Sequence, residues 1–152
     1  MCCPWELSPI GMFPLNGLSY QKDLRLTIPE LIDKYLGKPF EEEKFDCFSF
    51  LVRWYQDQGI DLSDYRHNGY WQGQSVNTET YFKLWRKLES TETPKENDAI
   101  FMTAQDGRLH MGIVIGDGTY IHCMRREGVV RSPMGKHQKL FEGIYRLKIL
   151  DD

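Results

Sequence analysis

The fold is decided by residues 109–123, which read LHMGIVIGDGTYIHC. Two apolar segments flank the turn-forming pair Asp117-Gly118, and this arrangement is a strong signal for a β-hairpin. One histidine interrupts each segment, His110 in the first and His122 in the second. We therefore predict two antiparallel strands that each carry a histidine.

Alternating apolar and polar residues continue on both sides of this hairpin. Glycine-containing pairs at residues 106–107 and 127–128 mark further tight turns. The expected strands cover residues 99–102, 109–115, 119–123, 128–131 and 143–149. Because short turns join consecutive strands, the sheet is expected to be antiparallel.

The N-terminal half carries helix signals instead. Thr27 and Glu30 have the spacing of a capping box, and Pro29 lies in the first turn, where proline is tolerated. Gly37 is a suitable residue to end the helix. We predict a short helix over residues 28–36.

Two more helices are expected before the strands. One begins at Asp46, repeats apolar residues every three or four positions and ends at Gly59, and the other covers residues 78–88. Helices followed by a meander of strands predict an α+β fold, with helices packed on an antiparallel sheet of about five strands. Residues 1–24, rich in proline, glycine and isolated aromatics, predict an extended arm before one domain at residues 25–152.

Composition narrows the classes of function. The chain has 152 residues, 19 of them basic and 22 acidic, with a net charge of −3 and no basic stripe, so no nucleic-acid partner is expected. Its apolar runs are too short for a membrane span, and the N-terminus lacks the pattern of a signal peptide. Cysteines at positions 2, 3, 47 and 123 show neither a disulfide framework nor a CxxC pair.

Cys47 follows directly after Asp46, in the first turn of the second predicted helix. Unpaired backbone N–H groups and the helix dipole at this position are expected to lower the pKa of the thiol, which favours the nucleophilic thiolate. The alternative is a small core residue, because free cysteines are commonly buried hydrophobes. Position alone does not decide between the two.

A single histidine in an apolar strand is more often structural than functional. Two on consecutive strands, together with Cys47, can supply a nucleophile, a base (His110) and a residue that orients the base (His122). This triad requires both rings on one face of the hairpin. An odd number of linking residues gives that arrangement, whereas a two-residue type I′ turn at Asp117-Gly118 would place the rings on opposite faces.

Other readings of these side chains are weaker. A four-ligand zinc site from Cys47, Cys123, His110 and His122 would need two consecutive strand residues to point the same way, which strand geometry forbids. No metal or cofactor is therefore expected. Cys123 is interpreted as a core residue, and His67 and His137 as solvated side chains.

Four segments together resemble the NlpC-type family of cell-wall cysteine peptidases. They are Phe45-Asp46-Cys47-Phe48-Ser49-Phe50-Leu51-Val52, Asn97-Asp98-Ala99-Ile100-Phe101, His110-Met111-Gly112-Ile113-Val114-Ile115-Gly116 and Tyr120-Ile121-His122, and they follow the family's order and spacing across residues 28–132. The family's phage tail-assembly branch is the most similar, through Tyr35-Leu36-Gly37-Lys38-Pro39-Phe40 and Arg53-Trp54-Tyr55. One departure is Phe40, which stands where many members have a tyrosine that helps to orient the site, and Tyr35 is a candidate to replace it.

The resemblance implies a papain-like fold and hydrolysis of peptide bonds in peptidoglycan stems, with Cys47, His110 and His122 as the triad and no cofactor. It also implies a component of a phage tail tip that is made in the host cytoplasm and acts in tail assembly or in wall penetration at genome entry. Residues 1–24 would then contact other tail-tip proteins. The alternatives are an inactive structural tail-tip subunit that keeps the fold, and a bacterial cytoplasmic amidase.

Overall fold

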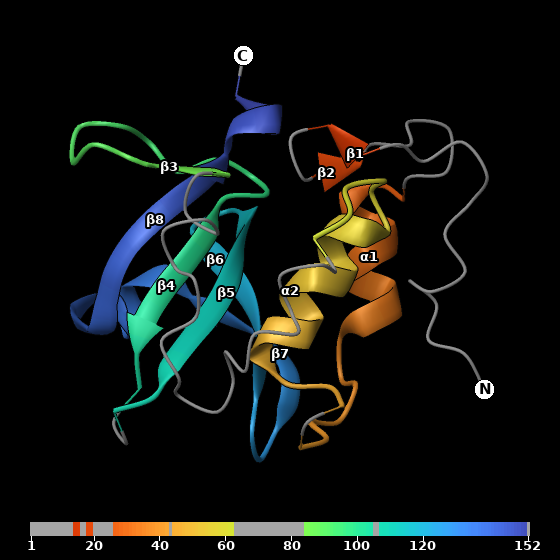
Figure 1. Cartoon of the computed structure of the whole chain (residues 1–152). Coiled ribbons are helices and arrows are strands. Elements are labelled where there is room, and N and C mark those ends of the chain that lie inside the picture. Colours follow the sequence, from red (N-terminus) through yellow and green to blue (C-terminus); the bar gives the residue numbers. More distant parts are fainter. Residues whose placement is uncertain are drawn as a thin grey trace.

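A computed structural model describes residues 14–15, 18–19, 26–42, 44–62, 84–104 and 107–151. Two helices, α1 (Ile28–Tyr35) and α2 (Cys47–Gln56), lie on one side of a six-stranded antiparallel sheet, and α2 packs directly against β5 and β6 (Figure 1). The sheet consists of β3 (Trp85–Lys87), β4 (Ala99–Thr103), β5 (Leu109–Gly116), β6 (Thr119–Met124), β7 (Gly128–Pro133) and β8 (Phe141–Leu147). Its spatial order is β3-β8-β4-β5-β6-β7. The predicted α+β class is confirmed.

Several short elements accompany the helices and the main sheet. Within the range predicted as an arm, β1 (Pro14–Leu15) and β2 (Leu18–Ser19) pair with each other, and the other residues of 1–24 lie outside the described ones. Three 3₁₀ turns follow β7 and β8, at Met134–Lys136, Gln138–Leu140 and Lys148–Leu150. Within the described ranges, no helix is long and apolar enough to cross a membrane.

The first predicted helix is confirmed together with its cap. The Thr27 backbone N–H donates to Glu30 Oε1 at 2.9 Å, and the Glu30 N–H donates to Thr27 Oγ1 at 3.4 Å, so both halves of the capping box are present. Gly37 follows with a φ of 86°, a conformation that glycine adopts without steric cost. Its N–H donates to the Val129 carbonyl, which fastens the end of α1 to β7.

The second helix is fixed by its N-cap and by its apolar surface. Asp46 Oδ1 accepts hydrogen bonds from the Ser49 N–H at 2.8 Å and from Ser49 Oγ at 2.9 Å. Burial extends around most of the helix and is complete for Leu51 and Trp54. This buried surface holds the N-terminus of α2, and Cys47 with it, against the sheet.

The five predicted strands exist, with one shift and one addition. The last strand was predicted at 143–149 but is β8, Phe141–Leu147, and the chain then enters a 3₁₀ turn. The helix predicted at 78–88 is wrong over Trp85–Lys87, which form β3 and pair with β8, whereas residues 78–83 lie outside the described ones. The physical reason is tertiary: Trp85 is buried edge-to-face against Tyr55 and Phe101, which outweighs helix-like apolar spacing.

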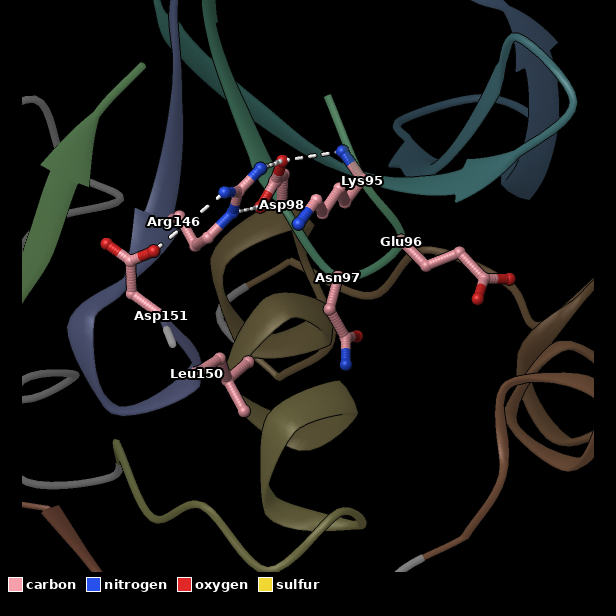
Figure 2. A pocket seen from close by; sticks show the side chains of 7 residues that line it. All are labelled: Lys95, Glu96, Asn97, Asp98, Arg146, Leu150 and Asp151. Atoms are coloured by element: carbon pink, nitrogen blue, oxygen red, sulfur yellow. Dashed lines mark hydrogen bonds and ion pairs between the residues drawn. The ribbon is translucent and has the colours of Figure 1, made fainter. Parts of the chain in front are cut away.

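A hollow of about 170 Å³ opens beside the start of β4 (Figure 2). It is lined by Lys95, Glu96, Asn97, Asp98, Arg146, Leu150 and Asp151. None of the predicted catalytic residues borders it. Three of its charged side chains are paired with one another: Arg146 lies 2.7 Å from Asp98 and 3.9 Å from Asp151.

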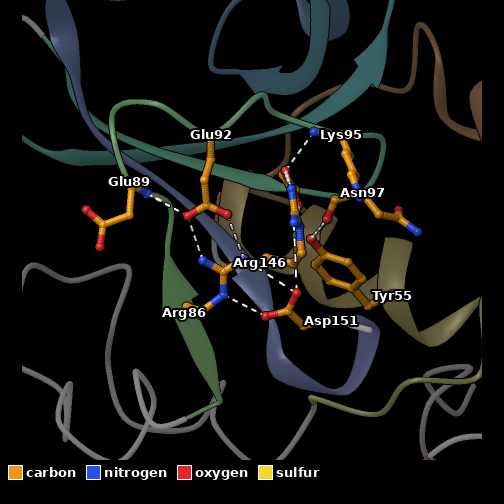
Figure 3. Close-up of polar contacts among 9 residues, drawn as sticks. Tyr55, Arg86, Glu89, Glu92, Lys95, Asn97, Arg146 and Asp151 are labelled. Carbon is orange, nitrogen blue, oxygen red and sulfur yellow. Dashed lines mark hydrogen bonds and ion pairs between the residues drawn. The ribbon is translucent and has the colours of Figure 1, made fainter.

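The bidentate pair among them joins Asp98, the residue before β4, to Arg146 in β8. Asp98 accepts from Arg146 Nε at 2.7 Å and from Arg146 Nη2 at 2.8 Å, and both side chains are buried. Nearby, Arg86 bonds Glu92 at 2.7 Å and Asp151 at 2.6 Å in a more exposed cluster (Figure 3). Bidentate pairing satisfies the buried Asp98 carboxylate, so the network has a structural explanation.

Candidate active site

The β5–β6 hairpin places both histidines on one face of the sheet, an arrangement that the sequence alone did not decide. Asp117 and Gly118 have φ values of 55° and 68°, positive at both central positions as a type I′ turn requires. By itself this two-residue turn would separate the histidines. A bulge between Val114 and Gly116 adds one residue to β5. This extra residue returns the two histidine side chains to the same face.

The register then makes the two histidines diagonal neighbours. His122 stands opposite Gly112, and His110 lies two residues before Gly112 on the same face. Their rings are 5.0 Å apart between centroids, and His110 Nε2 lies 2.8 Å from His122 Nδ1. The arrangement that the triad requires is therefore present.

His122 has a second hydrogen-bond partner on the next strand. Its Nε2 lies 2.9 Å from the Oγ of Ser132 in β7, and both residues are buried. Burial first, and then the positive charges of His110, His137 and Lys136, lower the pKa of His122 to about 3. The ring is therefore neutral near neutral pH.

Cys47 is the first residue of α2 and is half-buried. The backbone of Met111, which directly follows His110 in β5, acts to lower the pKa of the Cys47 thiol. Because α2 packs on β5, Cys47 begins the helix that lies against the strand carrying His110. The hydrogen bond between the two histidines is present, whereas a contact between the Cys47 sulfur and His110 stays a prediction.

The resting state of the Cys47 thiol differs from the expectation. Burial, followed by the charge of Asp46, raises its pKa to about 12, although hydrogen bonds from the backbone of Met111, Phe48 and Cys47 itself act in the opposite direction. Because the side chain is only half-buried, water relieves part of this penalty, but the direction is upward. The predicted lowering of the pKa is wrong for this state, and Cys47 rests as a thiol.

Tyr120 packs beside His122, a role that the sequence did not predict for it. The two rings lie 4.4 Å apart between centroids, and the Tyr120 hydroxyl is 2.7 Å from His137 Nδ1. A Cβ on Gly112 would lie 2.6 Å from the Tyr120 ring, so glycine makes room for it. His137, predicted to be solvated, is instead half-buried and bonded, whereas His67 lies outside the described residues.

Cys123 has the core role predicted for it. It is 1% exposed, and its Sγ lies 3.8 Å from the Phe45 carbonyl oxygen. As the neighbour of His122 on β6, it points to the opposite face of the sheet. Within the described ranges, no group of three or more potential ligands could hold a metal ion.

The NlpC/P60 family model matches residues 34–142 of this sequence. The chain belongs to the NlpC/P60 family. This range contains α2, the β5–β6 hairpin and Ser132, so the match covers all the site residues described above.

Individual relatives agree with this assignment. The chain is 30% identical over 130 residues to tail tip assembly protein K of Escherichia phage N15, covering 82% of this chain and 54% of that protein. It is 29% identical over 109 residues to the peptidoglycan DL-endopeptidase CwlO of Bacillus licheniformis, covering 70% of this chain and 22% of that one. It therefore spans about half and about a fifth of the lengths of these two proteins.

Solved structures of the family share the fold. An NlpC/P60 family protein from Bacillus cereus superposes with a TM-score of 0.55 at 23% identity, covering 81% of this chain and 41% of that one. The papain-like α+β architecture expected from the resemblance is thus confirmed.

Asn97 adopts a left-handed backbone conformation directly before Asp98. Its φ is 77°. Asparagine is among the few residues that tolerate this left-handed region. Its side chain also accepts from Trp54 Nε1 at 2.8 Å and bonds Gln58, so it ties α2 to the start of β4.

Phe40, the departure from the family pattern, is not compensated by Tyr35. The Tyr35 hydroxyl donates to Asp57 Oδ2 at 2.5 Å, just beyond the C-terminal end of α2. Cys47 begins that helix, about 15 Å away at 1.5 Å per residue. Phe40 itself is half-buried, and the guanidinium of Arg125 lies 5.7 Å from its ring centroid.

Proposed function

We propose that this chain is a cysteine peptidase or amidase that cleaves a peptide bond in the stem of bacterial peptidoglycan. Cys47 is the nucleophile, His110 the general base and His122 the orienting residue. The observation that carries the proposal is the hydrogen-bonded series His110–His122–Ser132, whose two histidines lie on the strands against which α2 packs. Membership of the NlpC/P60 family and similarity to a peptidoglycan endopeptidase support the substrate class.

The roles of the two His110 nitrogens follow from which of them is hydrogen-bonded to His122. Because Nε2 of His110 bonds His122, Nδ1 is the nitrogen that exchanges a proton with Cys47. As the sulfur attacks the carbonyl carbon, His110 takes the thiol proton and then gives it to the leaving amine when the C–N bond breaks. Water, deprotonated by His110, hydrolyses the thioester to a carboxylate and regenerates the thiol.

Because the pKa of the thiol is raised, proton transfer to His110 must accompany the attack of the sulfur. A thiol that rests protonated needs the base during attack, so Cys47 and His110 act together rather than as a preformed ion pair. Backbone N–H groups at the start of α2, including that of Cys47, are oriented to stabilise the developing oxyanion with the help of the helix dipole.

Mass spectrometry of peptidoglycan fragments tests this proposal. The purified chain should release new stem-peptide fragments, Cys47→Ala should release none, and Cys123→Ala should retain activity because it removes a thiol outside the site. A folded wild-type chain that cleaves no stem peptide would instead favour a structural tail-tip subunit.

The place of action is a separate part of the proposal. Similarity to a phage tail tip assembly protein supports a virion component, with residues 1–24 contacting neighbouring tail-tip proteins. Six apolar residues in that segment motivate the contact: Trp5, Leu7, Ile10, Met12, Phe13 and Leu15. Deleting residues 1–24 should leave the melting temperature nearly unchanged and abolish incorporation into virions. A large fall in melting temperature with normal incorporation would contradict this part.

A further inference from the structure

His122 lies between two partners that together determine which ring nitrogen carries its proton. Nδ1 faces His110 Nε2 at 2.8 Å, and Nε2 faces Ser132 Oγ at 2.9 Å. A neutral imidazole has one donor and one acceptor nitrogen. His122 must therefore donate to one partner and accept from the other. The hydrogen bonds of the series can thus run in one of two directions, either from Ser132 toward His110 or from His110 toward Ser132.

Only one direction suits His110 as a base. If His122 donates from Nδ1, His110 must accept on Nε2, and its own proton then occupies Nδ1, the nitrogen needed for the Cys47 proton. If His122 donates from Nε2 to Ser132, its Nδ1 accepts from His110 Nε2–H. His110 Nδ1 can then take the proton and carry it as an imidazolium.

We propose that Ser132 is a positioning residue that accepts the Nε2–H of His122 and thereby keeps the His122–His110 pair in the direction that catalysis requires. The assignment rests on the function proposed above for this site. Ser132 stands opposite Tyr120 in the β6–β7 register, its hydroxyl bonds His122 Nε2, and the Tyr120 ring lies 4.4 Å from the His122 ring between centroids. Ser132 is 6% exposed and His122 1%, so water does not readily replace the hydroxyl.

Removal of this hydroxyl has a defined consequence. In Ser132→Ala the Nε2–H of His122 would be buried without an acceptor, which is costly. The ring would then favour the tautomer with the proton on Nδ1, where it can still donate to His110. That tautomer opposes the imidazolium of His110, because two N–H groups would face each other.

The experiment measures tautomer and turnover in the full chain. Nitrogen-15 NMR of histidine-labelled protein, with His122 assigned by the loss of its signals in His122→Asn, should show the His122 proton on Nε2. In Ser132→Ala it should move to Nδ1, and kcat on stem peptides should fall about tenfold to a hundredfold with little change in KM. Ser132→Thr, which keeps a hydroxyl, should restore both.

Thr27→Ala is the matched control, because it removes a hydroxyl from the cap of α1 and leaves the histidine series intact. It should change neither the tautomer nor kcat. A wild-type His122 protonated on Nδ1 would overturn the assignment, as would a Ser132→Ala chain with unchanged tautomer and turnover. An Nε2–H tautomer in a chain that cleaves no stem peptide would overturn the proposed function and leave the role of Ser132 standing.

Discussion

His110 and His122 are held 2.8 Å apart, between Nε2 of the first and Nδ1 of the second, by a bulge four to six residues away in β5. Asp117 and Gly118 make a type I′ turn that alone would put the rings on opposite faces. The bulge at Val114–Gly116 shifts the register by one residue and returns both rings to the same face. The geometry of the histidine pair therefore depends on the backbone conformation of turn and bulge residues whose side chains have no chemical role.

His110→Ala and His122→Asn should differ in the severity of their effects. Loss of the base removes proton transfer, and we expect kcat to fall about 10²- to 10⁴-fold. Asparagine at position 122 can still accept from His110 Nε2–H, so residual activity should be measurable. Steady-state kinetics on stem peptides would decide, and equal losses in kcat would show that the division of roles is wrong.

Gly112→Ala should disturb the site through Tyr120. The added Cβ would lie 2.6 Å from the Tyr120 ring and 3.2 Å from the Ile121 carbonyl oxygen, so the ring must move away from residue 112. Because the displaced ring contacts His122, we expect a loss of about 1–3 kcal/mol in the free energy of unfolding, together with reduced kcat. Gly135→Ala is the matched control, because a Cβ there meets nothing within 4 Å. Equal urea midpoints and activities for the two variants would contradict the prediction.

His122 should make stability fall in acid. Its pKa is lowered from 6.5 to about 3 on folding, so between these values the unfolded chain binds a proton that the folded chain does not. This contribution is complete above pH 6.5 and is lost as the pH falls toward 3. Between pH 7 and 4.5 we expect His122→Asn to lose roughly 2 kcal/mol less stability than the wild type, measured by urea unfolding. Parallel pH profiles would rule this out.

Alkylation of Cys47 should be selective but should require alkaline pH. Cys47 is half-buried, whereas Cys123 is 1% exposed, so iodoacetamide should modify Cys47 faster. Because its pKa is raised to about 12, the rate should keep climbing from pH 7 to pH 10 as the thiolate fraction grows. Peptide mass spectrometry would give both rates. A plateau below pH 8 would indicate a preformed thiolate, and equal rates at the two cysteines would refute the selectivity.

The sequence predicts those features that depend on local signals. The capping box at Thr27, the N-cap at Asp46 and the period-two strands determine local structure, and the structure confirms them. The strand β3 was missed because Trp85 is held by contacts with residues distant in sequence. Cys47 was expected to have a lowered pKa because a helix terminus can be recognised in sequence, whereas the extent of burial cannot.

Ser132 shows the same limit within the site. Its role depends on the β6–β7 register, which places it opposite Tyr120 and next to His122 in space. A small polar residue in an apolar strand was the available signal, but it has many ordinary explanations. Only the pairing of three strands shows that Ser132 extends the histidine pair.

The ion pair between Asp98 and Arg146 should stabilise the fold without taking part in catalysis. The Asp98 side chain is 1% exposed and the Arg146 side chain 10%, so Arg146→Met would leave a buried carboxylate without its bidentate partner. Breaking such a pair typically costs about 3–5 kcal/mol, which urea unfolding would detect. Arg86→Met is the matched control, because its pairs with Glu92 and Asp151 are more exposed and its loss should cost much less. If this network is structural, both variants should keep the kcat of the wild type at temperatures where they remain folded. A kcat that collapses in folded Arg146→Met, while stability is unchanged, would instead assign the charged hollow beside β4 to the reaction.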